Sequence, residues 1–159
     1  ATFFLDELAR NGVPTALTFA TSHPTSVNAL FTEARQRGLR LITGKVLQDR
    51  HSPDGVRDQT EQSLIDTEAL IKQWHGVDRL GYAITPRFAP SCSEAQLTGA
   101  GELAARYPDV WIQSHVSENL DEVRWAALSR EAMVGAKRFS RDAFDRATLD
   151  LLARTSRMS

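Results

Sequence analysis

The sequence predicts an α/β fold in which one helix is followed by four repeats of a strand and a helix. Short apolar runs alternate with amphipathic segments over the first 128 residues. Residues typical of turns and helix ends separate the runs. Hydrophobic residues make up 42% of the chain and charged residues 25%, as in ordinary globular domains. Strands that alternate with helices in this way are joined by crossovers, so we expect them to run parallel.

The helices are predicted from apolar residues at helical spacing and from start and stop residues. Gly12 and Gly38 end the first two helices, and Pro24 stands near the start of the second. Ser93 opens the fourth helix and Asn119 the fifth, as N-cap residues. The predicted helices cover residues 2–12, 23–38, 59–76, 93–108 and 119–128.

The strands are predicted from apolar or β-rich runs that end in polar loops. The predicted strands cover residues 14–21, 39–46, 79–85 and 109–118. The loop after the second strand contains Pro-Asp-Gly, a turn sequence. Trp74, Trp111 and Trp125 are expected to be core residues, and the strand that begins at Trp111 is expected to be buried.

Two folds fit this order, an open doubly wound sheet and a (β/α)₈ barrel of the TIM type. No Gly-x-Gly-x-x-Gly follows the first strand, which weakens a dinucleotide-binding interpretation. A full barrel needs about 250 residues, so four units would form about half of one. We therefore expect a partial barrel at residues 1–128 and a tail of uncertain structure, rich in Arg and Asp, at 129–159.

Composition excludes several classes of protein. The net charge of -1 gives no reason to expect a nucleic-acid or anionic-membrane surface. No apolar run approaches the ~20 residues of a membrane span, and Cys92, the only cysteine, excludes multi-cysteine zinc motifs. A cytoplasmic location is the default expectation. The chain does not begin with Met, and we expect it to be a piece of a longer sequence.

Polar residues collect where the predicted strands end. Functional residues of both candidate folds lie at the carboxyl ends of parallel strands. The second, third and fourth strands end in "GKVLQDR", "TPRF" and "SHVSE". We therefore expect one mouth to carry Lys45, Asp49, Arg87, His115 and Glu118.

His115 and Glu118 each have a catalytic interpretation and a structural one, whereas Lys45 and Asp49 are assigned no chemical role. His115 is a candidate metal ligand, because neutral imidazole is the commonest one, or a hydrogen-bonded histidine. Glu118 is a candidate general acid and base beside a metal-bound water, or a carboxylate at a helix start. Lys45 and Asp49 are expected to form ion pairs with neighbouring residues.

Arg87 follows Pro86, so its planar fork stands on a restricted backbone. Such a fork suits a carboxylate or the carbonyl edge of a purine, and a surface ion pair is the alternative. Phe88 is placed to stack on a flat ring, or to pack in the protein. Cys92 is expected to be a buried, inert thiol.

Three stretches together resemble the guanine deaminases of the amidohydrolase superfamily. They are "GKVLQDR" at 44–50, "YAITPRFAPSCS" at 82–93 and "IQSHVSENLDEV" at 112–123, and "TFATSHPTSVNALF" at 18–31 is also similar. The resemblance covers roughly residues 1–128. It implies a distorted (β/α)₈ barrel, a zinc cofactor, guanine as a small-molecule substrate, xanthine and ammonia as products, and a homodimer in the complete protein.

Carried over to this sequence, the resemblance makes His115 a metal ligand and Glu118 the proton shuttle, with Arg87 and Phe88 holding the purine. The family also uses a His-x-His pair, a further histidine and an aspartate that have no counterpart here. Zinc is therefore not expected to be held by this chain alone. Two alternatives stay open, a non-catalytic half-barrel that binds or dimerises, and another amidohydrolase that acts on an aminated heterocycle.

Overall fold

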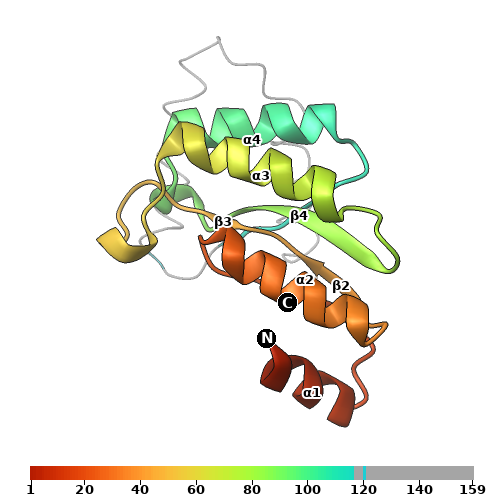
Figure 1. Cartoon of the computed structure of the whole chain (residues 1–159). Helices are drawn as coiled ribbons and strands as arrows, with labels where there is room; N and C mark the ends of the chain where they lie inside the picture. Colours follow the sequence, from red (N-terminus) through yellow and green to blue (C-terminus); the bar gives the residue numbers. More distant parts are fainter. Residues whose placement is uncertain (117–119, 121–159) are drawn as a thin grey trace. The chain divides into compact units, whose positions relative to one another are not determined.

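A computed structural model describes residues 1–116 and 120 of the chain (Figure 1). The chain divides into two compact units, Ala1–Val116 and Ser117–Ser159, and the fold below is that of the first. Its helices are α1 Thr2–Arg10, α2 Pro24–Gln36, α3 Thr60–Trp74 and α4 Glu94–Arg106; its strands are β1 Thr15–Leu17, β2 Arg40–Thr43, β3 Val46–Leu47, β4 Leu80–Pro86 and β5 Trp111–Ile112. The predicted alternation is confirmed over this unit. The predicted helix at 119–128, apart from Leu120, and the predicted tail lie outside the described residues.

The strands form a parallel sheet whose order follows the chain. β1 pairs with β2, and β4 pairs with β2, β3 and β5. Thr43 faces Tyr82 and Val46 faces Thr85, so β2 and β3 keep the same register against β4 and form one interrupted ladder. Neighbours in simple chain order are typical of a barrel, whereas the strand order of a doubly wound sheet reverses at a switch point. The fold is therefore the partial barrel that the sequence predicts.

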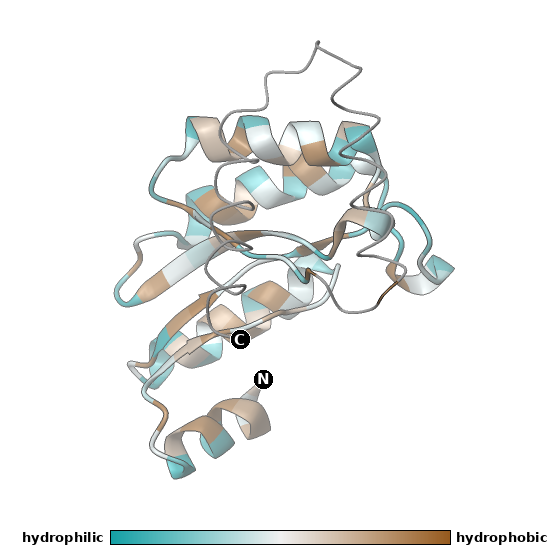
Figure 2. Ribbon diagram, turned by 180° about the vertical axis from the view of Figure 1, so that it is seen from behind, coloured by the Kyte–Doolittle hydropathy of each residue, from teal (hydrophilic) through white to brown (hydrophobic). Residues whose placement is uncertain are grey.

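The helices cover one face of the sheet. Leu80, Tyr82 and Ile84 alternate along β4 and belong to a single apolar core with side chains from all four helices. Each helix packs against the next one along the chain, as Figure 1 shows for α3 and α4. Figure 2 shows hydrophobic residues both in the strands and along the helices. Burial raises the pKa of Tyr82 to about 12, and its hydroxyl accepts a hydrogen bond from the backbone N–H of Lys45.

The ladder between β2 and β4 breaks at Gly44. A Cβ on Gly44 would lie 1.7 Å from the carbonyl oxygen of Ala83, so only glycine allows this close approach. The next backbone N–H, that of Lys45, donates to the side-chain hydroxyl of Tyr82 instead of to the backbone of β4. The predicted strand at 39–46 is therefore two short strands that share one direction.

The last strand corrects one expectation from the sequence. Trp111 is 52% exposed and Ile112 44% exposed, so the start of β5 is not buried. The Trp111 ring lies near Gly81, on the face of β4 opposite the helices. An apolar residue type predicts burial but does not show which face of a sheet the residue occupies, and this face carries no described helix. Trp74 is buried as predicted, and Trp125 lies outside the described residues.

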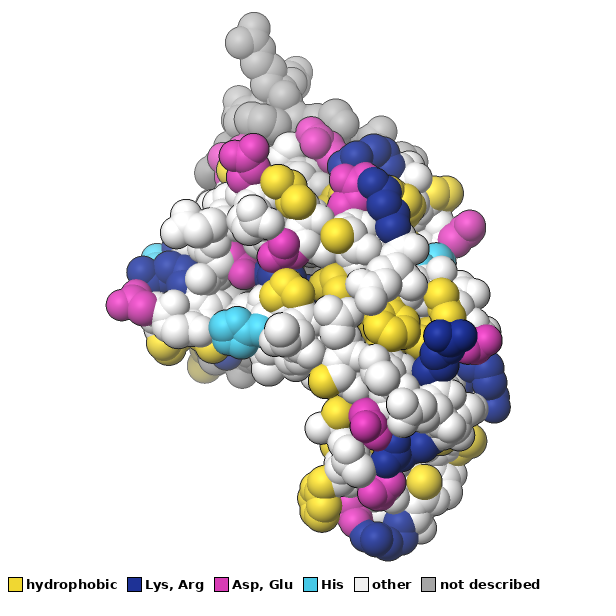
Figure 3. Space-filling view, viewed as in Figure 1, with side chains coloured by type: hydrophobic (Ala, Val, Ile, Leu, Met, Phe, Trp, Pro, Cys, Tyr) yellow, Lys and Arg dark blue, Asp and Glu magenta, His cyan; other side chains and the backbone are white. Residues whose placement is uncertain are grey.

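Charges of both signs are interspersed over the face drawn in Figure 3. Surface ion pairs connect neighbouring helices, for example Arg37 of the α2 C-terminus with Asp6 of α1, and Arg106 of α4 with Glu68 of α3. None of the described helices is both long and apolar enough to cross a membrane.

One ion pair, between Lys45 and Asp58, lies inside the protein. The Lys45 side chain is 2% exposed and that of Asp58 8%, and Lys45 Nζ lies 2.6 Å from Asp58 Oδ1. The other carboxylate oxygen, Oδ2, accepts from the backbone N–H of Gln48 at 3.0 Å and from Gln96 Nε2 at 3.3 Å. These bonds fix the end of β3 to the start of α3 and to α4. A buried charge needs such partners, because water cannot solvate it.

We predict that Lys45→Met strongly destabilises the chain, because it leaves the Asp58 carboxylate buried without its cation. The expected loss is about 3–5 kcal/mol in the free energy of unfolding, measured by urea denaturation. Lys72→Met, which breaks an exposed pair with Glu68 on α3, is the matched control and should change stability little. Replacing both charges, with Lys45→Met and Asp58→Asn, should recover part of the loss, because the amide oxygen is neutral and can still accept from the Gln48 N–H. Equal stability of Lys45→Met and the wild type would contradict the assignment.

Candidate functional site

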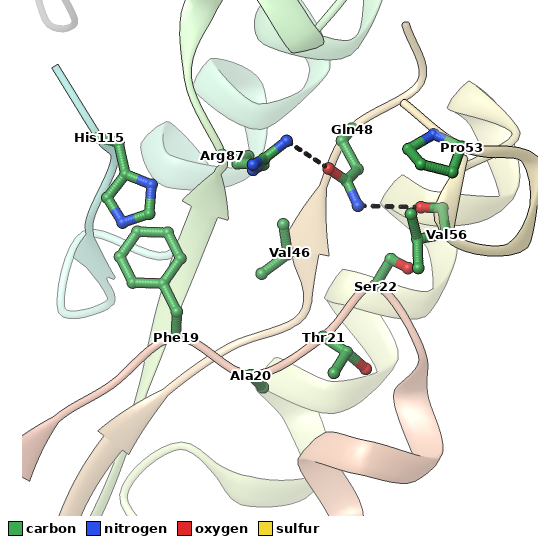
Figure 4. A pocket seen from close by; sticks show the side chains of 10 residues that line it. All are labelled: Phe19, Ala20, Thr21, Ser22, Val46, Gln48, Pro53, Val56, Arg87 and His115. Atoms are coloured by element: carbon green, nitrogen blue, oxygen red, sulfur yellow. Dashed lines mark hydrogen bonds between the residues drawn. The ribbon is translucent and has the colours of Figure 1, made fainter. Parts of the chain in front are cut away.

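A cavity of about 450 Å³ lies at the carboxyl ends of the strands (Figure 4). This volume is within the range of small-molecule sites. Its lining comes from the segment after β1, from β3 and the loop that follows it, and from the residues after β4 and β5. The lining residues are Phe19, Ala20, Thr21, Ser22, Val46, Gln48, Pro53, Val56, Arg87 and His115.

Arg87, the first residue after β4, is held from three directions. Its backbone N–H donates to the Leu47 carbonyl at 3.0 Å, which extends the pairing of β3 with β4. Its guanidinium carbon lies 5.3 Å from the centre of the Phe88 ring, a cation–π contact. Its Nη1 lies 3.5 Å from Gln48 Oε1, a long hydrogen bond (Figure 4). The planar fork therefore stands at the cavity with a defined orientation.

Phe88 supports Arg87 and is not among the described residues that line the cavity. It is half-buried and precedes the short helical turn Ala89–Ser91. Its contact with the guanidinium is the one aromatic interaction that the structure gives it among the described residues.

His115 follows β5 and lines the same cavity as Arg87, 28 residues earlier. Its backbone N–H donates to the Arg87 carbonyl at 2.8 Å, so a single hydrogen bond fixes the distance between the two backbones. Its imidazole stacks on Phe19, with the ring centres 4.1 Å apart and the planes 12° from parallel (Figure 4). The structure thus brings together two of the residues that the sequence singled out. Glu118 lies outside the described residues.

Lys45 and Asp49 do not line the cavity, which corrects the expectation that they share its mouth. Side chains alternate along a strand, and here Val46 and Gln48 face the cavity while Lys45 and Asp49 point away from it. Polar character alone had marked Lys45 and Asp49. Because side chains alternate along a strand, the position of Val46 predicts that Gln48 lies on the same side and at the cavity.

Gln48 is buried, with 7% of its surface exposed, and its amide is held in one orientation. Nε2 donates to the carbonyl of Val56 at 3.1 Å, so Oε1 is the atom turned toward Arg87. Its backbone N–H donates to Asp58, so the ion pair with Lys45 also fixes the position of Gln48.

Asp49 fastens the wall of the site to two helices. Its carboxylate accepts from the Ser93 N–H at 2.6 Å, from the Ser93 hydroxyl, and from the Thr60 hydroxyl at 2.6 Å. Ser93 is the N-cap of α4, as predicted, and Thr60 begins α3. Burial by itself would raise the pKa of Asp49, but the hydrogen bonds from Ser93 and Thr60 outweigh it and leave the pKa below its ordinary value.

The loop after Arg87 is bound to the segment after β3. The Arg50 N–H donates to the Ser91 carbonyl at 3.0 Å, and its side chain donates to the carbonyl of Pro90. The Cys92 thiol is buried and donates to the Leu47 carbonyl. Burial raises the pKa of Cys92, which makes the reactive thiolate scarce. Cys92 is therefore a packing residue, as the sequence suggested.

The described residues do not by themselves form a metal centre. Within residues 1–116 and 120, no three His, Cys, Asp or Glu side chains lie close enough to hold an ion together. A catalytic zinc usually takes three protein ligands, and His115 supplies one imidazole at the cavity.

We predict that Asp49→Asn destabilises the chain at neutral pH. The lowered pKa means that the carboxylate stabilises the fold above its ordinary pKa of 3.8, and that this contribution disappears as pH falls through the lower pKa of the folded state. The urea midpoint of Asp49→Asn should be below that of the wild type at about pH 7, and the two should converge in strong acid. Asp78→Asn, at an exposed ion pair with Arg35, is the control. A gap that widens on acidification would refute the assignment.

Comparison with known proteins identifies the family of the chain. Guanine deaminase of Escherichia coli (strain K12) is 49% identical over 123 residues, 77% of this chain and 28% of that protein. The solved structure of E. coli guanine deaminase matches with a TM-score of 0.76 at 48% identity, over 78% of this chain and 29% of that one. The structure of guanine deaminase from C. acetobutylicum with guanine bound in its active site matches with a TM-score of 0.75 at 35% identity, over 81% and 31%.

The chain thus spans less than a third of the length of these relatives. The matches cover about four fifths of this chain. The sequence matches the model of the family described as "Amidohydrolase family" over residues 2–133, most of its length. The chain belongs to the amidohydrolase family.

Proposed function

We propose that this chain forms the purine-binding side of a guanine deaminase site, which hydrolyses the 2-amino group of guanine to give xanthine and ammonia. One observation carries the proposal: Arg87 and His115 line the same cavity at neighbouring strand ends. The similarity to guanine deaminases, one of them with guanine in its active site, supports the choice of substrate.

In this proposal Arg87 recognises the carbonyl edge of the purine. The guanidinium presents several N–H donors in one plane, and O6 and N7 of guanine are neighbouring acceptors that such a fork binds with two hydrogen bonds. The Phe88 ring beneath the guanidinium keeps the fork from rotating freely. Holding the ring in one orientation increases the rate, because the reacting carbon is then presented in a single position.

We assign proton transfer to Glu118 and a ligand role to His115. The Glu118 carboxylate, three residues after His115, would take a proton from the water that attacks C2 and then deliver it to the departing amine, because a free amide ion is a poor leaving group. We propose zinc as the metal that His115 contacts, with its other ligands supplied by residues outside the described part of the chain. A homodimer in the cytoplasm is the assembly and location that we propose for the complete protein.

The substrate assignment is tested in the complete, metal-loaded protein by the amount of xanthine formed from guanine, with cytosine, adenine and ammeline as control substrates. We expect Arg87→Lys to lower kcat/KM for guanine roughly 100-fold, because an ammonium group keeps the charge but loses the planar pair of donors. Arg35→Lys, at an exposed ion pair with Asp78, is the matched control and should leave the rate unchanged. Deamination of ammeline but not of guanine would replace this substrate with another aminated heterocycle.

We also predict that the purified 159-residue chain holds well below one zinc ion per molecule. Its four histidines, at 23, 51, 75 and 115, include no His-x-His pair. Among the described residues, His115 is the one histidine that lines the cavity. Metal analysis after dialysis against a weak chelator measures this directly. One tightly held zinc per molecule would show that this chain contains a complete metal site.

A further inference from the structure

We propose that Gln48 is a specificity-determining residue of the cavity, whose side-chain oxygen accepts a hydrogen bond from a ring N–H while Arg87 donates to the adjacent ring carbonyl. The ligand class is a purine with a lactam edge, a C6 carbonyl next to N1–H, such as guanine or hypoxanthine. The inference rests on the proposed function for the choice of a purine, and it extends that function by naming the edge that is recognised.

Hydrogen bonds fix the orientation of the Gln48 side-chain amide. An amide group offers both a donor and an acceptor, and its environment decides which one faces a ligand. The Gln48 Nε2 is committed to the carbonyl of Val56 at 3.1 Å, which can only accept. Oε1 therefore faces Arg87, and the cavity wall presents an acceptor at this point (Figure 4).

Burial and a backbone hydrogen bond keep Gln48 Oε1 in place. Gln48 is 7% exposed, and its backbone N–H is bound to the Asp58 carboxylate, which is itself paired with buried Lys45. The bond between Oε1 and Arg87 Nη1 is long, at 3.5 Å, so Oε1 keeps capacity for a second and shorter hydrogen bond. A ligand that offers an N–H here would satisfy an oxygen that has limited access to water.

Arg87 and Gln48 together present a hydrogen-bond donor beside an acceptor. Arg87 can only donate and Gln48 Oε1 can only accept, and the two groups are neighbours on one wall. A lactam edge carries the complementary pair, an accepting oxygen beside a donating N–H. Adenine carries the reverse pair, an amino donor beside a ring nitrogen acceptor, so it would place two donors together and two acceptors together. Sites built around such pairs reject the mismatched ligand, because buried polar groups are left unpaired.

The experiment measures binding to the purified 159-residue chain by equilibrium dialysis. The probes are hypoxanthine and 1-methylhypoxanthine, which differ only in whether N1 carries a hydrogen or a methyl group. Hypoxanthine has no 2-amino group, so its binding reports recognition independently of any deamination. We expect the wild type to prefer hypoxanthine by roughly tenfold or more.

Gln48→Met removes the acceptor at similar volume and is expected to bring this preference close to one. Gln48→Leu removes the same acceptor with a different apolar side chain and should also bring the preference close to one, which covers the case in which the Met variant does not fold. Gln62→Met, at an exposed position of α3 that bonds Asp66, is the control and should behave as the wild type.

The two possible roles of Gln48 give different results. If Gln48 only positioned Arg87, Gln48→Met would weaken both ligands equally and leave their ratio unchanged. That outcome, or a folded wild type that does not bind hypoxanthine, would overturn the inference. If hypoxanthine binds with the expected preference while the complete, metal-loaded protein forms no xanthine from guanine, the proposed deamination fails and the recognition by Gln48 stands.

Discussion

The buried ion pair between Lys45 and Asp58 is the constraint on which the geometry of the cavity depends. Two opposite charges closed off from water must stay together, so the end of β3 and the chain entering α3 cannot separate without exposing one of them. Asp58 uses its second carboxylate oxygen to bind the Gln48 backbone and the Gln96 side chain of α4. The cavity wall at Gln48 is thereby fixed to two helices of the outer layer.

Hydrogen bonds also connect two of the stretches that resemble guanine deaminases, residues 44–50 and 82–93. The segment after β3 bonds the loop after β4 through Arg50 and Asp49, which bind Ser91 and Ser93 respectively. In the other direction, Arg87 and Cys92 both donate to the carbonyl of Leu47. Each stretch therefore supplies the hydrogen-bond partners of the other. A change in one alters the position of the second, and Arg87 depends on both.

The sequence predicts the elements of this fold well and their details less well. The start of α4 at Ser93 follows from local chemistry, because capping involves residues a few positions apart. The break at Gly44 could not be predicted, because it depends on a carbonyl oxygen of Ala83, 39 residues away in sequence. The exposure of Trp111 depends on which sheet face it occupies, and hydrophobicity does not contain that information.

The residues of the cavity likewise divide into those that the sequence predicts and those that it does not. Arg87 and His115 were predictable because parallel strands bring their carboxyl ends to one edge of the sheet, a consequence of topology. Lys45 and Gln48 were not distinguished, because the prediction weighed polar character over alternation. A buried lysine that pairs internally and a glutamine that faces a cavity differ only in the parity of their positions on the strand.

Arg87 joins three strand ends through its backbone as well as its side chain. Its N–H binds the end of β3 at Leu47, and its carbonyl accepts from His115 after β5. Both bonds belong to peptide groups, so they persist whatever conformation the guanidinium adopts. The imidazole that stacks on Phe19 and the guanidinium beside Gln48 are therefore positioned relative to each other by one stretch of main chain. The sheet itself therefore determines the separation between these two groups, and in the proposed function the purine lies between them.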